Sequence, residues 1–281
     1  MSWQAKLSLR YWHDGAGTRA QHAHEGPLRV LKALYPEGPR CCQHVIVHPP
    51  SGLVGGDGLT LSIQLDAGAQ ALLTTPGATR FYRSEGAWAE QTVQAQLAEG
   101  SRLEWLPQET LVYNGALARN RLQFLLAPGA EMIGCDVVAL GLPEAGLPFA
   151  AGVIEQVLQV QVSPPLTGWL ERARVSSDDV ALLHSPAGLA GRGVWGLLWW
   201  AQGTALEPAR RDSLLEAARD AIALSPLASC AGVTQVQPNV VVLRGLAERA
   251  EPLAQLLRAV RSRWRQQAWQ AEQGDLRLWA T

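Results

Sequence analysis

Acidic residues interrupt several apolar, strand-like stretches of the sequence. They are Asp57, Glu104, Glu109, Asp136 and Glu171. A carboxylate in a dry core costs several kcal/mol unless it is paired, hydrogen-bonded or in contact with water. We therefore expect some of these side chains to line a wet interior that could attract cations. Two other interpretations stay open for each: an outward-facing position on an alternating strand, and a structural ion pair, such as Glu171 could form with an arginine.

Two groups of imidazole and thiol side chains could bind a metal ion. His22 and His24 would face the same side of a strand, as would Cys42 and His44, and His48 follows closely in the second group. These ligand types suit nickel, copper or zinc. Neither group has the spacing of a closed zinc site, and His48 stands beside two prolines, where it could be only a turn residue. Metal binding and a purely structural role both stay open.

Motifs for nucleotide binding and for nucleophilic catalysis are missing or weak. The sequence contains neither the nucleophile-elbow pattern GxSxG nor the Walker phosphate-binding loop. The pattern GxGxxG occurs at 191–196, but no clear strand precedes it and no amphipathic helix follows, so we interpret it as chance. The glycine-rich stretch 52–58 lacks a lysine and leads into a strand, which predicts a tight turn with close backbone approach.

Composition excludes several classes of partner. The 281 residues carry 24 Lys and Arg against 25 Asp and Glu, a net charge of −1, which predicts binding to neither nucleic acid nor an anionic membrane. No apolar run reaches the roughly 20 residues that cross a bilayer. The first fifteen residues lack the apolar run of a secretory signal, so we expect a cytoplasmic protein. Only 17% of residues are charged and 11 are Trp, which suggests apolar surface reserved for another protein.

The elements that position these residues follow a repeat. Apolar and polar residues alternate through 59–65, the pattern breaks at 66–68, and a second strand-like run follows at 69–75. Similar units follow at 92–106 and 121–138, and the turn glycines of the three units are Gly68, Gly100 and Gly129. This period of about 30 residues predicts one long hairpin per repeat in a stack of β layers. A fourth strand-like run at 153–162 extends the series.

The C-terminal part has a different pattern. Residues 208–224 and 247–270 have the apolar spacing of helices, and a short hairpin is predicted between them at 233–236 and 240–243. We interpret the arginines of the second helix as a solvated face rather than a nucleic-acid surface; they are Arg258, Arg261, Arg263 and Arg265. The expected fold is mainly β. It is one domain, 1–281, with a stacked β-hairpin or β-helical body over about 1–205 and a helical appendage over about 206–281.

Five sequence blocks resemble those of the UreD family of urease accessory proteins, also called UreH. The blocks are GPLRV at 26–30, LYPE at 34–37, HPPSGLVGGD at 48–57, LLTTPGAT at 72–79 followed by YRS at 82–84, and LEWLPQE at 103–109. Weaker similarity continues to the helical end, so the resemblance covers essentially the whole chain. One departure is Ser51, where the family commonly has glycine.

The resemblance implies a role without catalysis. Proteins of this family act with UreF, and through UreF with the GTPase UreG, to load nickel into apo-urease. It implies a β-rich stack with C-terminal helices and an internal, water-filled passage for nickel. By motif match, the passage would be lined or shaped by Asp57, Asp136, Glu171 and Arg172, with Arg172 holding the Glu171 carboxylate. No tightly bound cofactor is expected, only transient Ni²⁺.

Two other functions are consistent with the residues. The first is a stand-alone metal-binding enzyme that uses Cys42, His44 and His48. The second is a plain scaffold that docks UreF and contains no passage.

Overall fold

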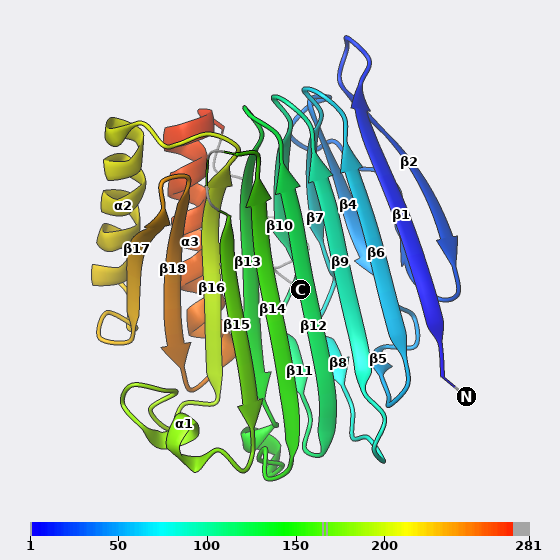
Figure 1. Ribbon diagram of the computed structural model, residues 1–281, viewed down its shortest axis with the longest axis vertical. Coiled ribbons are helices and arrows are strands. Elements are labelled where there is room, and N and C mark those ends of the chain that lie inside the picture. Colours follow the sequence, from blue (N-terminus) through cyan, green and yellow to red (C-terminus); the bar gives the residue numbers. More distant parts are fainter. Residues whose placement is uncertain (1, 165, 167, 272–281) are drawn as a thin grey trace.

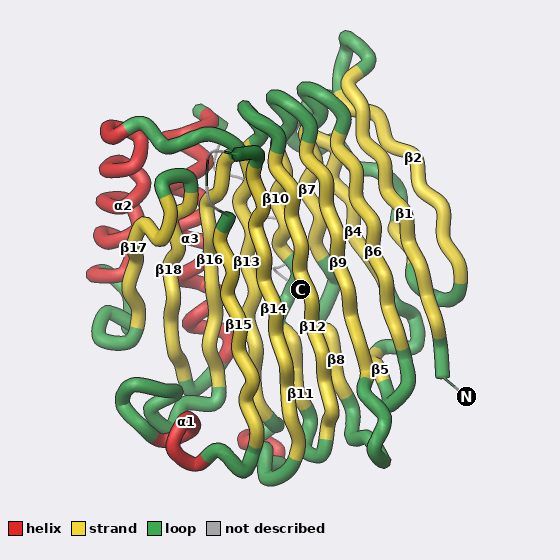
Figure 2. Tube along the Cα trace, viewed as in Figure 1, coloured by secondary structure: helices red, strands yellow, loops and turns green. Residues whose placement is uncertain are grey.

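Two β-sheets packed face to face make up most of the protein in a computed structural model that describes residues 2–164, 166 and 168–271 (Figures 1 and 2). The first sheet has seven strands, in spatial order β15 (Trp169–Ser176), β14 (Gly152–Val162), β12 (Ala116–Leu126), β9 (Ala89–Leu97), β6 (Gly58–Leu65), β1 (Gln4–His13) and β2 (Thr18–Glu25).

The second sheet has eleven strands. Its main path is β17 (Ala231–Gln237), β18 (Val240–Ala247), β16 (Val194–Gln202), β13 (Glu131–Leu140), β10 (Arg102–Leu106), β7 (Gln70–Thr74), β4 (Cys41–Val47) and β3 (Arg29–Val30). Three short strands extend it through pairings of β11 with β13 and of β8 with β11 and β5; they are β5 (Gly52–Leu53), β8 (Thr79–Phe81) and β11 (Thr110–Val112). The mainly β, stacked fold expected from the sequence is thereby confirmed.

The repeat units are arches that join the two sheets, not hydrogen-bonded hairpins. The turn at Gly68, which has a φ of 72°, connects β6 of the first sheet to β7 of the second. Each strand pairs in parallel with the same strand of the next repeat, so that Gly58 lies opposite Glu90 and Ala89 lies opposite Ala118. The arch is preferred because it turns the apolar faces of both strands toward one shared core, whereas a hairpin would place both strands in one sheet.

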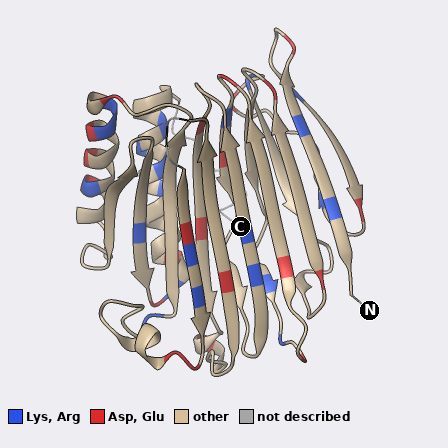
Figure 3. Ribbon diagram, viewed as in Figure 1, with Lys and Arg blue, Asp and Glu red and all other residues tan. Residues whose placement is uncertain are grey.

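Ion pairs cross the outer face of the first sheet as a ladder. Glu90, Arg119, Glu155 and Arg174 are register neighbours on β9, β12, β14 and β15. Arg119 Nη1 lies 2.6 Å from Glu90 Oε1, and its Nε lies 2.9 Å from Glu155 Oε2. Arg174 Nε lies 3.6 Å from Glu155 Oε1. Opposite charges therefore alternate across these strands (Figure 3), and a slip by one residue would separate them.

Two long helices pack on the outer face of the second sheet at one end of the stack (Figure 1). Helix α2 (Pro208–Ala223) starts at its proline, and α3 (Ala250–Trp269) follows, so both predicted helices are confirmed. The predicted hairpin between them is β17 and β18, which continues the second sheet through β16. The tryptophan-rich strand β16 is buried between this helical layer and the inter-sheet core. The predicted appendage to residue 281 includes 272–281, which lie outside the described residues.

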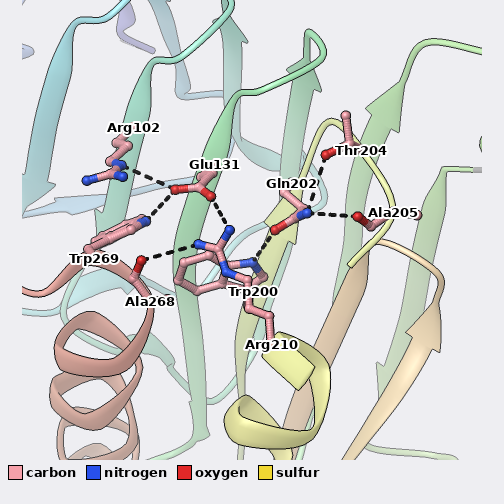
Figure 4. Close-up of polar contacts among 9 residues, drawn as sticks. All are labelled: Arg102, Glu131, Trp200, Gln202, Thr204, Ala205, Arg210, Ala268 and Trp269. Atoms are coloured by element: carbon pink, nitrogen blue, oxygen red, sulfur yellow. Dashed lines mark hydrogen bonds and ion pairs between the residues drawn. The ribbon is translucent and has the colours of Figure 1, made fainter. Parts of the chain in front are cut away.

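Glu131 of β13 ties the helices to the sheet (Figure 4). Its carboxylate accepts from Arg210 Nη1 of α2 at 2.6 Å, from Trp269 Nε1 of α3 at 2.6 Å, and from Arg102 Nε of β10 at 3.2 Å. The Arg210 guanidinium also lies 4.8 Å from the centre of the Trp200 ring. One carboxylate thereby fixes both helices on the same side of the sheet.

The prediction that the arginines of α3 form a solvated face is wrong for two of them. Arg261 and Arg265 are buried, and both pair with the buried Glu104 of β10, at 2.6 Å and 3.2 Å respectively. Arg265 also pairs with Glu37. Strand alternation explains the arrangement, because Leu103 and its inward neighbours enter the inter-sheet core while Glu104 projects toward α3. Among the described residues, no helix is both long and apolar enough to span a bilayer.

Candidate functional site

A cavity of about 550 Å³ lies between the two sheets where β14 and β15 face β13, β16 and β18. Three of the four residues expected along a passage border it: Asp136, Glu171 and Arg172. They come from β13 of the second sheet and β15 of the first, so the stack brings together residues that are far apart in the sequence. Gln156 and Arg244 complete its polar wall.

Asp136 is the most buried carboxylate of this cavity, with 9% of its surface exposed. Its Oδ2 accepts a hydrogen bond from Gln156 Nε2 at 2.7 Å, and Gln156 Oε1 in turn accepts from Trp195 Nε1 at 3.1 Å. Burial raises the pKa of Asp136 to about 6, against the opposing effect of the Gln156 hydrogen bond. Its charge is therefore present at neutral pH but is poorly compensated, which makes it a cation-attracting group.

Glu171 is held by Arg244, not by Arg172. Arg244 Nη2 lies 2.6 Å from Glu171 Oε2, and its Nε donates to Oε1 at 3.1 Å. Arg172 follows Glu171 on the same strand, so alternation turns its side chain to the other face, where the residue is exposed. The expected role of Arg172 as the partner of Glu171 is wrong. Arg244 was missed although it interrupts the apolar strand Val240–Ala247, which is the same signal that identified the carboxylates.

Asp57 lies elsewhere and holds a turn. Its two carboxylate oxygens accept from the backbone N–H groups of Trp3, at 2.7 Å, and Val54, at 2.9 Å. The preceding glycines confirm the tight turn expected there: a Cβ at Gly55 would overlap the Ser84 hydroxyl, and Gly56 has a φ of 94°. Asp57 does not line the 550 Å³ cavity.

A second cavity, of about 230 Å³, lies close to this turn. His48, Ser51, Thr79 and Gln91 are among its lining residues. His48 Nε2 is buried and has no hydrogen-bond partner among the described residues. Burial lowers the pKa of His48, and the charge of Asp57 opposes that shift. The imidazole therefore stays neutral at neutral pH, and its free nitrogen is able to take a hydrogen bond or a cation.

The structure brings His22, from the first group of possible metal ligands, close to His44, from the second. His44 Nδ1 lies 2.7 Å from the Tyr11 hydroxyl in the core, and its ring centre is 6.2 Å from that of His22. Burial, and then His22, lower the pKa of His44 to about 4. Burial raises the pKa of Cys42. In the part of the chain that the structure describes, no group of three or more His, Cys, Asp or Glu could hold a metal ion.

The remaining carboxylates singled out in the sequence lie outside both cavities. Glu104 pairs with α3 on the opposite face of the second sheet. Glu109 is half-buried and lines neither cavity. Asp136 and Glu171 both border the larger cavity. Glu171 nevertheless follows the ion-pair interpretation through Arg244, as Glu104 does through Arg261 and Arg265.

Comparison with known proteins gives one consistent family. The family described as UreD urease accessory protein matches residues 4–280. The urease accessory protein UreD of Methylibium petroleiphilum is 53% identical, that of Leptothrix cholodnii 52% and that of Verminephrobacter eiseniae 50%, each over 100% of both chains. These relatives are named as accessory proteins and not as catalysts, so the alternative of a stand-alone metal-binding enzyme is set aside. The chain belongs to the UreD family of urease accessory proteins.

Proposed function

We propose that this chain matures urease as a cytoplasmic adaptor between apo-urease and UreF, with UreG bound through UreF, and that Ni²⁺ reaches urease through its interior. The family supports the role in urease maturation. The observation that supports a nickel route is the 550 Å³ cavity, in which the carboxylates of Asp136 and Glu171 face the space between the sheets.

The chemistry of this cavity suits transient contact with a cation. A hydrated divalent ion needs oxygen groups that lower its desolvation cost without holding it tightly, because a deep site would stall transfer. Asp136 supplies one carboxylate with a single hydrogen-bond donor beside it, and Glu171 supplies a second whose charge is largely offset by Arg244. Two separate, partly compensated carboxylates favour passage over storage.

The test measures nickel delivered to apo-urease by the purified complex. First, a pull-down of this chain against UreF and apo-urease establishes the adaptor role; failure to capture either one would contradict it. Next, Asp136→Asn and Glu171→Gln are compared with wild type in timed loading reactions, with the exposed Glu99→Gln as the matched control. We expect slower loading for the two cavity variants alone. Equal nickel content for all four proteins would leave a scaffold without a passage.

Asp57 needs a different treatment. Its carboxylate holds two backbone N–H groups of the turn, so Asp57→Ala would disturb local structure as well as charge. Asp57→Asn removes the charge and keeps one acceptor oxygen, but its NH₂ group cannot accept from the other backbone N–H, so the unfolding midpoint must be measured beside nickel loading. Slow nickel loading by Asp57→Asn with an unchanged unfolding midpoint would place Asp57 on the route, whereas slow loading together with a lowered midpoint would assign it a structural role.

A further inference from the structure

A row of amide side chains crosses the inner face of the first sheet between the two cavities. Gln91, Asn120 and Gln156 are register neighbours on β9, β12 and β14. Gln91 lines the 230 Å³ cavity and Gln156 lines the 550 Å³ cavity. Asn120, only 2% exposed, lies between them and lines neither.

This row is costly as core packing. The inward neighbours of Asn120 on its own strand are Ala118 and Leu122, both buried and apolar. Asn120 Oδ1 accepts from Gln91 Nε2 at 3.3 Å, and no other hydrogen bond of the Asn120 side chain exists among the described residues. A side-chain amide carries two donor hydrogens and two acceptor lone pairs, so most of its capacity needs water or an ion. A leucine would fill the same space without that cost.

The opposite wall is polar at the same place. Thr79 of β8 lies beside Thr110 of β11 in register, and both precede inward-facing core residues by two positions. Thr79 lines the 230 Å³ cavity together with Gln91, and Thr110 is 4% exposed. The second sheet therefore also carries two neighbouring polar residues at inward strand positions, one of which lines the same cavity as Gln91.

The outer ladder fixes the alignment of this row. Glu90, Arg119 and Glu155 immediately precede Gln91, Asn120 and Gln156 on the same three strands. Successive residues of a strand point to opposite faces of the sheet. The ion pairs on the outer face therefore hold the three strands in a register that keeps the amides adjacent on the inner face.

We infer that the amide row Gln91–Asn120–Gln156 is the crossing by which a divalent cation and its water move between the two cavities, with Asn120 as its narrowest point. This inference rests on the proposed nickel passage and assigns its middle section. Amide oxygens are neutral ligands for a hard cation, so they replace part of its hydration without the tight hold of a carboxylate. The charged groups then lie at the two ends: Asp57 near the first cavity, and Asp136 and Glu171 in the second.

The decisive variant is Asn120→Leu, which keeps the branched shape and the number of heavy atoms of the side chain and removes both polar atoms. We expect nickel loading of apo-urease to slow by about tenfold or more, one decade corresponding to the loss of a single favourable oxygen contact at the barrier. Gln91→Leu, at a less buried position, should slow loading in the same way and keeps the test valid if Asn120→Leu does not fold. The matched control is Gln123→Leu, which removes a similar amide pair, Gln94 with Gln123 at 3.1 Å, from the outer face of the same two strands.

A direct readout is available because the sequence contains only three asparagines: Asn114, Asn120 and Asn239. In the chain labelled with ¹⁵N-asparagine and complexed with UreF, paramagnetic Ni²⁺ should broaden the side-chain signal of Asn120 and spare that of the buried Asn239. Loading at the wild-type rate by both leucine variants, with Asp136→Asn still slow, would overturn the crossing and leave the passage intact. Wild-type rates for all three would overturn the passage itself.

Discussion

Glu171 and Arg244 join the two sheets across the larger cavity, through a two-pronged ion pair between residues 73 positions apart. The pair is partly exposed, so its contribution to stability is small, about 1 kcal/mol or less. Its main effect is electrostatic: the guanidinium reduces the attraction of the Glu171 carboxylate for a cation.

This pair predicts opposite effects for its two members. Arg244→Gln frees a carboxylate in the cavity that Asp136 also lines and should strengthen Ni²⁺ binding to the chain, while Glu171→Gln should weaken it. Titration calorimetry with NiCl₂ on the complex with UreF measures both, with Glu99→Gln as control. Weaker binding in Arg244→Gln would show that the arginine organises the site instead of tempering it.

Asp136 predicts an unusual dependence of stability on pH. Burial raises its pKa to about 6 from the ordinary 3.8, so the native state holds the proton more tightly than the unfolded chain. Its contribution to stability is therefore full below pH 4 and is lost as the pH rises through 6, by about 3 kcal/mol. Asp136→Asn should be more stable than wild type at pH 7.5 and gain little at pH 4. Urea unfolding at the two pH values measures this, and an advantage independent of pH would contradict it.

The same group predicts that cation binding requires pH above about 6. Protonation of Asp136 below that pH removes one of the two carboxylates of the cavity. Nickel affinity of the complex, measured from pH 5 to 7.5 in a non-coordinating buffer, should fall with a midpoint near 6 in wild type. In Asp136→Asn that step should vanish; a profile identical to wild type would assign it to another group.

Ser51 predicts a stabilising substitution. Its φ of 72° is in the left-handed region, where a Cβ costs about 1–2 kcal/mol. Glycine removes that cost, but it also increases the conformational entropy of the unfolded chain, which offsets part of the gain. Ser51→Gly should therefore raise the free energy of unfolding by about 0.5–1 kcal/mol. Thermal and urea unfolding measure the change. A lower midpoint would show that the serine side chain contributes more to this turn than its backbone strain costs.

The buried ion pairs of α3 predict a large loss of stability. Glu104→Gln would withdraw the negative charge that faces Arg261 and Arg265, both at most 3% exposed, and should cost about 3–5 kcal/mol. Asp220→Asn is the matched control, since it removes an exposed pair with Arg263 at 4.0 Å and should change stability by about 0.5 kcal/mol or less. Similar losses for both variants would contradict the importance of burial.

Local patterns predicted the strands of the repeats and the two long helices, because their periodicities depend on neighbouring residues, but they did not identify β1, β2, β4 or β15. The spacing of the turn glycines Gly68, Gly100 and Gly129 reproduces the observed strand register. The choice between hairpin and arch was not predictable in this way, since it depends on pairing with the neighbouring repeat. Arg261 and Arg265 were misassigned because hydropathy alone defines a helix face, and it does not register an arginine neutralised by a strand.

The residues of the candidate site likewise divide into those that sequence reasoning identified and those that it missed. The cost of burying charge identified Asp136 and Glu171, and the same argument applied to cations would have found Arg244. Asn120 carries no charge and sits in an ordinary alternating strand, so only its register with Gln91 and Gln156 reveals it. Asp57 was selected on the same grounds as Asp136 and Glu171, but its carboxylate holds a turn through contacts that depend on tertiary structure.

The parallel arches also allow the layers to be added in the order of synthesis. Each new arch pairs with the one made just before it, so layers are able to add in the order in which they leave the ribosome. Until the antiparallel strands β15 and β16 are made, the growing stack ends in unpaired backbone groups on β14 and β13. A nascent chain halted before Trp169 would therefore carry two open edges, the form most prone to pair with another copy of itself.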